Sequence, residues 1–343
     1  MGRPIRRADS GGADRRLIRI FEKTTLTVSN MRRGTYLFVL PWGLRGAGPE
    51  GKGGIGGVGK VFDELYTRFD RSEEFEPRVL TLDWSAHEAT DSVGPSGERV
   101  TRLRVRAPFG TGWLPYELLR YAFAMPGEMR RLRALIRRHD VRVANFHYIG
   151  TPAIAWVLAK TIGVFRGKVV FSLHGQDIRT IAAARGARRM LWRRALEAAD
   201  AIVACSRDLA EETVASFGLT GRNVVTIHNG VDADRLQELT TAGASTAQAE
   251  VRRPHLVNLG TFEHKKGHDL LLRAFVAVRK RFPTAHLTIV GRTAGALDAT
   301  RALRTELGLE DSVTFVIDAK GDVTEFIDDS LGRFKKVVES GDK

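Results

Sequence analysis

The stretch Thr35-Tyr-Leu-Phe-Val-Leu40 and the glycine-rich segment Gly51-Lys-Gly-Gly-Ile-Gly-Gly-Val-Gly-Lys60 together decide the fold expected for this chain. The first is a short apolar run typical of a buried strand. After the glycines, apolar residues recur at helical spacing from Val61 to Phe69, which predicts a helix that begins near Gly59. Glycines let backbone amides approach a ligand closely, and a helix N-terminus attracts anions. The segment therefore predicts either a phosphate-binding loop or a glycine-rich surface loop without a ligand.

Strand-like runs alternate with helical runs beyond this loop. We expect residues 83–97 to form a loop, and the helix at 114–139 to break near Pro126-Gly127. Alternation of this kind predicts a mostly parallel sheet covered by helices, with ligands at the carboxyl ends of the strands. The predicted strands are 78–82, 99–106, 141–146, 168–173, 201–204 and 224–227, and the other predicted helices are 152–160, 190–199 and 209–216.

The pattern restarts after a small, polar segment at 240–246. Strands are expected at 255–260, 286–291 and 313–316, with helices at 270–281, 300–307 and 323–329. A complete doubly wound domain has five or six strands, so the second half looks incomplete. The sequence thus predicts an α/β protein with two Rossmann-like doubly wound domains. Its expected parts are a basic extension (1–33), an N-terminal domain (34–235), a linker (236–253) and a partial C-terminal domain (254–343).

The charge balance favours an anionic partner. The 343 residues carry a net charge of +14, from 54 basic and 40 acidic side chains. No helix-turn-helix or aromatic-basic platform is recognisable, so nucleic acid is not expected. The basic amphipathic run Met129–Arg138 fits either an anionic membrane surface or a packed helix with a solvated face. No apolar run reaches the ~18 residues of a membrane span, and the single Cys205 indicates a reducing compartment. We therefore expect a cytoplasmic protein, with a peripheral position on the inner face of the cell membrane as a further possibility.

Polar residues follow several of the predicted strands. His147, His174, Ser206 and Asn229 all stand where a strand ends, and the carboxyl edge of a parallel sheet is where a site forms. Gly175 permits a sharp turn after His174, and Asp177 is placed to fix the tautomer of its imidazole. A lone histidine such as His147 is equally compatible with a structural role.

In the second half, Gly260-Thr-Phe-Glu-His-Lys-Lys-Gly267 joins a strand to a helix. Lys265 and Lys266 lie beside the start of that helix, where they are placed to neutralise phosphates. An ordinary charged loop is the alternative interpretation.

The order of these segments resembles the retaining nucleotide-sugar glycosyltransferases of family four, which have the two-domain GT-B fold. The family's Gly-Gly loop matches Gly56-Gly57 or, in an alternative register, Gly53-Gly54. The other matching segments are His174-Gly175, Ala199–Ser206, Asn229–Asp232, Gly260–Phe275 and Leu287–Gly291.

The resemblance implies roles for single residues. His174 and Asp177 would be catalytic, near the transferred sugar, and the glycine loop would contact the donor diphosphate in a cleft between two domains. Lys266 would stabilise the charge of the leaving diphosphate. The residues implied to bind substrate are Gly53, Gly54, Gly56, Gly57, His147, Ser206, Asn229, Lys265, Lys266 and Gly291.

The implied reaction moves a sugar from a UDP- or GDP-linked donor to a glycan or lipid-linked acceptor, with retention of configuration and without a metal or further cofactor. It would serve the synthesis of cell-surface polysaccharide or glycolipid. Two departures weaken the match. Thr261 stands where the family usually has arginine, a charge that Lys265 could partly replace, and no segment matches the family's glutamate-containing helix. A fragment, a frameshifted product or a chain completed by a partner would each explain the missing helix.

Two other functions stay open. A degenerate transferase could bind sugar nucleotides or a membrane surface without catalysis. The segment Gly54-x-x-x-x-Gly59-Lys60 also approaches an ATPase P-loop, but Val61 stands where a Ser or Thr hydroxyl would bind magnesium. Nucleotide hydrolysis is therefore the least favoured of the three.

Overall fold

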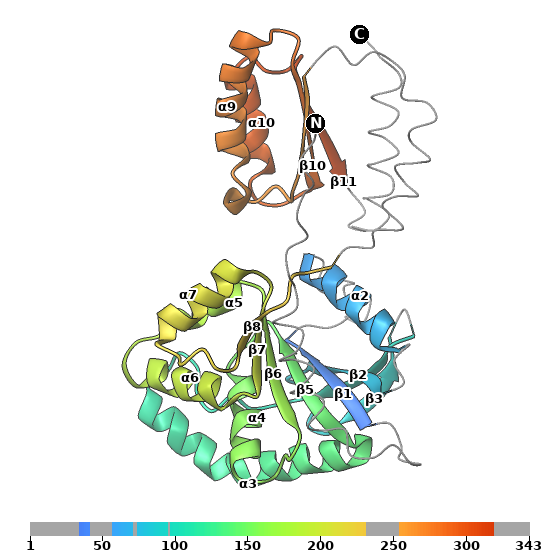
Figure 1. The fold of residues 1–343 in the computed structure, drawn as a ribbon, viewed down its shortest axis with the longest axis vertical. Coiled ribbons are helices and arrows are strands. Elements are labelled where there is room, and N and C mark those ends of the chain that lie inside the picture. The colour runs from blue at the N-terminus through green and yellow to red at the C-terminus, as the bar shows by residue number, and fades with distance from the viewer. Residues whose placement is uncertain (1–33, 42–56, 71–73, 95–96, 231–253, 319–343) are drawn as a thin grey trace, which may run out of the picture. The chain divides into compact units, whose positions relative to one another are not determined.

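The computed structural model describes residues 34–41, 57–70, 74–94, 97–230 and 254–318 (Figure 1). The chain divides into two compact units, unit 1 (Met1–Gly230) and unit 2 (Val231–Lys343). The predicted extension at 1–33 and the predicted linker at 236–253 lie outside the described residues, as do Gly53, Gly54 and Gly56.

Unit 1 is built on one sheet of eight strands in the order β3-β4-β2-β1-β5-β6-β7-β8. All neighbouring pairs are parallel except β3 with β4. The strand order reverses between β1 and β5, which is the switch point where ligands bind in open α/β sheets. The strands are β1 (Gly34–Leu40), β2 (Phe75–Leu82), β3 (Thr90–Val93), β4 (Arg99–Leu103), β5 (Val141–His147), β6 (Lys168–Leu173), β7 (Ala201–Ala204) and β8 (Val224–Thr226).

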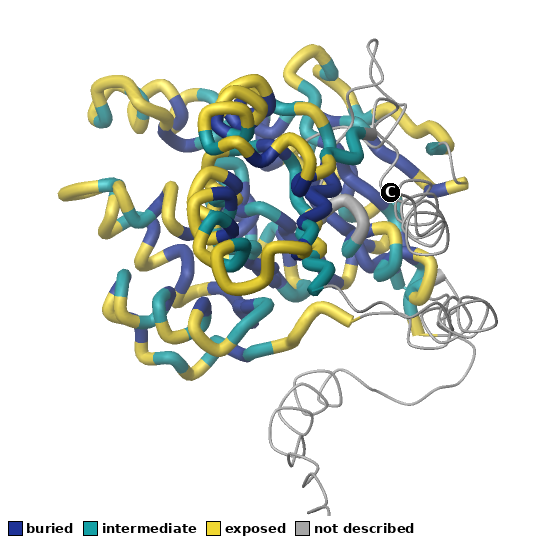
Figure 2. The backbone as a smooth tube through the Cα atoms, turned by 90° about the horizontal axis from the view of Figure 1, so that it is seen from above, coloured by how far each residue is buried: buried dark blue, intermediate teal, exposed yellow. Residues whose placement is uncertain are grey.

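Helices cover both faces of this sheet because side chains along β1 alternate between two cores. Leu37 and Val39 join the larger core with α3, α4, α5, α6 and α7, whereas Phe38 joins Phe62 of α2 on the opposite face. Figure 1 shows α2 on one side of the sheet, and buried residues are dark blue in Figure 2. The helices are α2 (Gly57–Asp70), α3 (Leu114–His139), α4 (Pro152–Thr161), α5 (Gln176–Ala182), α6 (Gly186–Ala198) and α7 (Arg207–Phe217).

Residues 83–97 were expected to form a loop, and this expectation is wrong for part of the segment. Thr90–Val93 pairs antiparallel with β4 as the outermost strand of the sheet. All four of its residues are exposed, so the strand carries no apolar alternation that a sequence pattern could reveal.

The expected break at Pro126-Gly127 is also absent, because α3 runs without interruption from Leu114 to His139. A proline inside a helix removes the hydrogen bond to the carbonyl four residues earlier, here that of Ala122. Neither Pro126 nor Ala122 is buried, so water can satisfy that carbonyl. Burial of Leu132 and Leu135 holds the second half of α3 against the sheet.

The loop expected before residue 190 contains helix α5 and the first turn of α6. Gly175 and Gly186 have φ angles of 101° and 55°, so both adopt a backbone conformation that favours glycine. Gly175 directly precedes α5 and Gly186 is the first residue of α6, so each glycine stands at the start of a helix within the segment that was expected to be a loop.

Unit 2 has a sheet of three parallel strands in the order β11-β10-β9 among its described residues. Its core gathers Phe262, Leu272, Phe275 and Ile289. The helix expected at 323–329 lies outside the described residues. The elements are β9 (His255–Leu259), the short 3-10 helix η1 (His264–Lys266), α9 (His268–Arg281), β10 (His286–Arg292), α10 (Leu297–Glu306) and β11 (Val313–Asp318).

Candidate functional site

The strongest candidate site lies at the carboxyl edge of β5 and β6, next to the switch point. His147 is the final residue of β5, not the residue after the strand as expected, and His174 directly follows β6. Because β5 and β6 are neighbours in parallel register, the two imidazoles meet. Nδ1 of His147 lies 3.2 Å from Nε2 of His174.

A chain of buried polar groups continues from this pair into the sheet. The amide nitrogen of Asn145 lies 3.2 Å from Nε2 of His147 and donates to the Tyr36 hydroxyl at 3.0 Å. The Ser172 hydroxyl donates to the amide oxygen of Asn145 at 2.9 Å. These residues come from β1, β5 and β6, three adjacent strands. His147 and His174 were expected at the site from the sequence, whereas Asn145, Ser172 and Tyr36 were not.

Burial keeps these polar side chains uncharged. It lowers the pKa of His147 to about 3, and the neighbouring His174 contributes in the same direction. Burial also lowers the pKa of His174, against the opposing charge of Asp177. The Tyr36 hydroxyl has a raised pKa because it is buried, although its hydrogen bond with Asn145 opposes the shift. Both imidazoles are therefore neutral at pH 7.

The carboxylate of Asp177 was expected to fix the imidazole of His174, but it bonds to the backbone instead. It accepts hydrogen bonds from the backbone N–H of His174, at 3.1 and 3.3 Å. Asp177 lies in the first turn of α5, where a carboxylate turned back toward a free backbone N–H stabilises the start of a helix. The group that contacts the nitrogen of the His174 ring is His147.

Tyr148 completes the surroundings of His174. Its ring stacks on the His174 ring, with centroids 5.6 Å apart and planes 13° apart. Tyr148 has a φ of 63°, a conformation that is uncommon for residues other than glycine and that occurs often at functional sites. No sequence pattern indicated it, because the strained backbone is set by the turn after β5.

Three other predicted site residues of unit 1 occupy different settings. The Ser206 hydroxyl accepts a hydrogen bond from the backbone N–H of Leu209 at 3.1 Å, so it caps α7. Asn229 is exposed, and Gly57 is the first residue of α2. Their predicted contacts with substrate stay predictions.

In unit 2 the predicted lysines lie in η1, directly before α9. Lys265 forms an ion pair with Glu263 at 2.6 Å, and Lys266 is exposed. His268, which the sequence analysis missed, is the first residue of α9 and is buried against Phe262, with ring centroids 4.9 Å apart. Gly291 has a structural role, since a β-carbon there would lie 1.9 Å from the carbonyl oxygen of Gly260.

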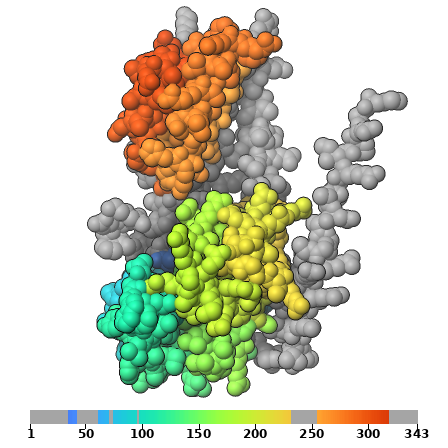
Figure 3. Space-filling model, turned by 90° about the vertical axis from the view of Figure 1, so that its left-hand side faces the viewer, coloured from blue at the N-terminus to red at the C-terminus, as the bar shows by residue number. Residues whose placement is uncertain are grey.

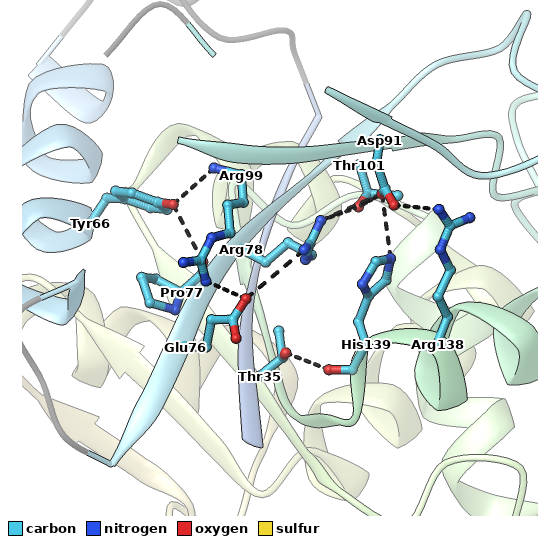
Figure 4. A network of polar contacts seen from close by, with 10 residues as sticks. All are labelled: Thr35, Tyr66, Glu76, Pro77, Arg78, Asp91, Arg99, Thr101, Arg138 and His139. Carbon is cyan, nitrogen blue, oxygen red and sulfur yellow. Dashed lines mark hydrogen bonds and ion pairs between the residues drawn. The ribbon is translucent and has the colours of Figure 1, made fainter. Parts of the chain in front are cut away.

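A second polar cluster in unit 1 gathers near the amino ends of β1, β2 and β4, away from the carboxyl edge (Figure 4). Asp91 is its centre, and its carboxylate contacts Thr101 and Arg138, each at 2.7 Å. The hydroxyl of Thr35 donates to the carbonyl of His139 at the end of α3. These contacts join β1, β3, β4 and α3, so the cluster is structural.

Neither a membrane span nor a metal site is found in the part of the chain that the structure describes. None of the helices there is both long and apolar enough to cross a membrane. Within the same ranges, no group of three or more His, Cys, Asp or Glu side chains is arranged to hold a metal ion.

Comparison with solved structures supports the fold. The protein HepE of Anabaena in complex with UDP has a TM-score of 0.54 at 14% identity, covering 83% of this chain and 70% of HepE. Sucrose-phosphate synthase from Thermosynechococcus elongatus gives a TM-score of 0.51 at 17% identity, covering 84% and 71% of the two chains. The predicted fold class, an α/β protein of GT-B type, is confirmed, and the sheet among the described residues of unit 2 is the smaller of the two.

Sequence relatives point the same way. The chain is 28% identical over 270 residues to a GDP-mannose-dependent alpha-(1-6)-phosphatidylinositol monomannoside mannosyltransferase of Mycolicibacterium smegmatis. The match over 268 residues to the enzyme of that name from Mycobacterium tuberculosis is also 28% identical. Each covers 76% of this chain and 63% of the relative, so the chain spans less than two thirds of their length.

Family models match both units. The model described as glycosyl transferases group 1 matches residues 246–331. The model of Glycosyltransferase Family 4 matches residues 55–235, more than half of the chain and nearly all of the sheet that carries His147 and His174. The chain therefore belongs to Glycosyltransferase Family 4.

Proposed function

We propose that this chain transfers a sugar from a nucleotide-sugar donor to an acceptor hydroxyl, with retention of configuration. The observation that carries the proposal is the position of His174, whose ring meets the buried His147 at the carboxyl edge of the sheet, beside the switch point. In the reaction, the bond between the sugar C1 and the diphosphate oxygen breaks, and C1 bonds to the acceptor oxygen. The nucleoside diphosphate leaves, and its departing oxygen takes up the proton that the acceptor hydroxyl loses.

The proposed roles divide between the two units. In unit 1, the part-exposed ring of His174 offers a hydrogen bond to an oxygen of the donor sugar. In unit 2, Lys265 and Lys266 stabilise the negative charge that grows on the departing diphosphate, and the start of α9 adds its dipole. The co-substrate is a GDP- or UDP-linked sugar, and neither a resident metal nor a further cofactor is part of the proposal.

Relatives narrow the first donor to test. The two mycobacterial relatives are GDP-mannose-dependent, and their named acceptor is a phosphatidylinositol mannoside. We therefore propose GDP-mannose as the first donor and a mannosylated lipid as the first acceptor, with UDP-glucose as the second donor. Such an acceptor fits a role in the synthesis of cell-surface glycolipid or polysaccharide.

The experiment uses the full chain with GDP-mannose labelled in the sugar. Labelled mannose should appear in the lipid extract, with one GDP released per sugar moved, and His174→Ala should remove this activity. Binding of GDP-mannose without transfer or hydrolysis, for this donor and for UDP-glucose, would favour the non-catalytic alternative. ATP hydrolysis that disappears in Lys60→Ala would favour the P-loop alternative.

We infer in addition that α3 rests on an anionic membrane surface. Trp113, directly before α3, is 75% exposed, and Tyr116, Leu119 and Phe123 are 57%, 58% and 81% exposed. Spacings of three and four residues place them on one side of the helix. The exposed Arg130, Arg133 and Arg137 continue along that side. The part of the chain that contains α3 is teal to green in Figure 3. Aromatic side chains beside arginines suit the boundary between lipid headgroups and acyl chains.

Vesicle flotation tests this surface. The full chain should float with phosphatidylcholine vesicles that contain phosphatidylserine, and high salt should weaken the binding. A Trp113→Ser, Phe123→Ser double variant should lose most of it. The matched control is Leu270→Ser, which removes an equally exposed apolar side chain from unit 2. Equal flotation of the double variant and the wild-type chain would contradict the inference.

A further inference from the structure

We propose that Asn145 and His147 are positioning residues, which hold His174 in the neutral tautomer that carries its proton on Nδ1. The proposal concerns the buried polar chain that runs from Tyr36 through Asn145 and His147 to His174. It rests on the proposed function only for its effect on catalysis, since the tautomer itself can be measured without a substrate.

The orientation of the Asn145 amide is the first step. Its oxygen accepts from the Ser172 hydroxyl, and its nitrogen faces both the Tyr36 hydroxyl and Nε2 of His147. One amide proton goes to Tyr36, which leaves the other for His147. This arrangement satisfies the amide oxygen and both amide protons of a buried side chain.

The second step is the tautomer of His147. Because Nε2 accepts from Asn145, a neutral His147 must carry its only proton on Nδ1. A charged His147 is disfavoured because the residue is 1% exposed and forms no ion pair among the described residues. Its contacts include Asn145, His174 and the rings of Phe38 and Phe62.

The third step passes this choice to His174. Nδ1 of His147 lies 3.2 Å from Nε2 of His174, while the ring centroids are 5.4 Å apart and the planes differ by 27°. The distance between the ring centroids exceeds the distance between the two nitrogens by roughly the width of an imidazole ring. The rings therefore meet edge to edge, and the contact is a hydrogen bond. His147 donates, Nε2 of His174 accepts, and the proton of His174 stays on Nδ1.

As a consequence, His174 has a fixed hydrogen-bonding role at the carboxyl edge of the sheet. Within the described residues, Nδ1 of His174 has no hydrogen-bond partner, and the ring is only partly buried. His174 therefore presents a proton donor to a ligand and has no free nitrogen lone pair with which to accept a proton. This suits the binding of an oxygen that accepts a hydrogen bond, such as that of a sugar hydroxyl or a phosphate. It also excludes a role of His174 as general base.

Nuclear magnetic resonance of the full chain, with ¹⁵N-labelled histidine, tests the proposal directly. Long-range ¹H–¹⁵N correlations show which ring nitrogen carries a proton, and single His→Gln variants assign the signals among the nine histidines. At pH 7 we expect His147 and His174 each to be protonated on Nδ1 alone. A proton on Nε2 of either ring would overturn the proposal. This measurement needs no variant of Asn145.

Asn145→Asp should reverse the donor and acceptor roles along the hydrogen bonds that link residue 145 to His174. The Tyr36 and Ser172 hydroxyls can donate to the new carboxylate, which then accepts the Nε2 proton of His147. The lone pair of His147 Nδ1 would face His174, which would carry its proton on Nε2. Asn145→Leu tests the same step without a buried charge and should give a mixture of tautomers. Asn223→Asp is the matched control, because Asn223 donates to the carbonyls of Leu196 and Ala199 and takes no part in the hydrogen bonds that link Tyr36 to His174.

The kinetic measurement separates this inference from the proposed function. If the chain transfers sugar, Asn145→Asp should lower kcat about 10- to 100-fold, the effect of leaving one hydrogen bond unmade, with little change in KM. Unchanged tautomers in both Asn145 variants would overturn the inference even if the enzyme is active. Inverted tautomers in a chain that transfers no sugar would refute the proposed function alone.

Discussion

The α-carbon of Gly291 faces the carbonyl oxygen of Gly260 so closely that a β-carbon built on Gly291 would lie 1.9 Å from that oxygen. The end of β10 and the residue after β9 are thus packed backbone to backbone. Gly291→Ala forces these strands apart and should lower the stability of unit 2 by about 3 kcal/mol. Urea unfolding, followed by hydrogen exchange of β9–β11, measures the loss. Gly295→Ala, where the new methyl group meets no described atom within 4 Å, should change little.

Gly175 determines how the chain turns after His174. Its φ of 101° is strained for any residue with a β-carbon, so Gly175→Ala should destabilise unit 1 by about 1–3 kcal/mol. Gly127 makes the matched control, because it lies inside α3 with open space around its α-carbon. Gly127→Ala should stabilise the protein by up to about 1 kcal/mol. The same sign for both substitutions in urea unfolding would contradict this interpretation.

Asp200 joins α4 to β6 at the start of β7. Its carboxylate accepts from the Val169 N–H at 2.8 Å, lies 3.2 Å from Lys168 Nζ and also contacts Lys160 Nζ. Asp200→Asn keeps the shape but leaves two lysines without their counter-charge, so it should cost about 2 kcal/mol of unfolding free energy. Asp140→Asn, at an exposed ion pair with Arg142, should cost less than about 1 kcal/mol. Equal losses would show that the setting of Asp200 is not special.

The depressed pKa of His147 makes stability depend on pH. Its pKa is about 3 in the folded chain and 6.5 for a histidine exposed to water, so below pH 6.5 the unfolded chain binds a proton that the folded chain rejects. As the pH decreases from 6.5 to 3, this histidine should therefore lower the unfolding free energy by up to about 1.4 kcal/mol per pH unit. His147→Phe should reduce this slope in urea unfolding between about pH 7 and pH 5. Identical slopes would refute the assignment.

Lys266 provides a kinetic prediction for the proposed reaction. If its charge stabilises the departing diphosphate, Lys266→Ala should lower kcat about 100- to 1,000-fold. Lys280→Ala, at the far end of α9, removes the same charge from the same helix and should leave kcat unchanged. Rates with GDP-mannose over a range of donor concentrations separate kcat from KM. Similar rates for the two variants would remove Lys266 from the proposed mechanism.

Much of the fold could be predicted because local patterns are strong. The continuous apolar run around Phe38 and the helical spacing around Phe62 are both clear signals, and both elements form as expected. Strand ends also identified His174, which lies beside the switch point. Where the prediction failed, packing or exposure had overridden the local signal: Pro126 stays within α3, and the exposed Thr90–Val93 still pairs with β4.

The polar chain behind His174 could not be predicted in the same way. Asn145 and Ser172 interrupt apolar strands, and that interruption was the available signal, but their partners depend on strand order. A pattern within one segment cannot show that Asn145 faces Tyr36. Nor can it show that the Asp177 carboxylate turns to the backbone of His174, since this depends on the φ of Gly175.

The hydrogen bond between Asn145 and Tyr36 spans 109 residues of sequence, and the pairing of β1 with β5 joins parts of the chain that are similarly far apart. A ribosome that adds about 5–20 residues per second needs roughly 5–20 s to make that interval. During this time β1 lacks its neighbour β5, the strand that carries Asn145. Until β5 is made, cover for this strongly apolar strand has to come from α2 and β2, which are synthesised before it, or from a chaperone. The polar chain behind His174 can form only after that.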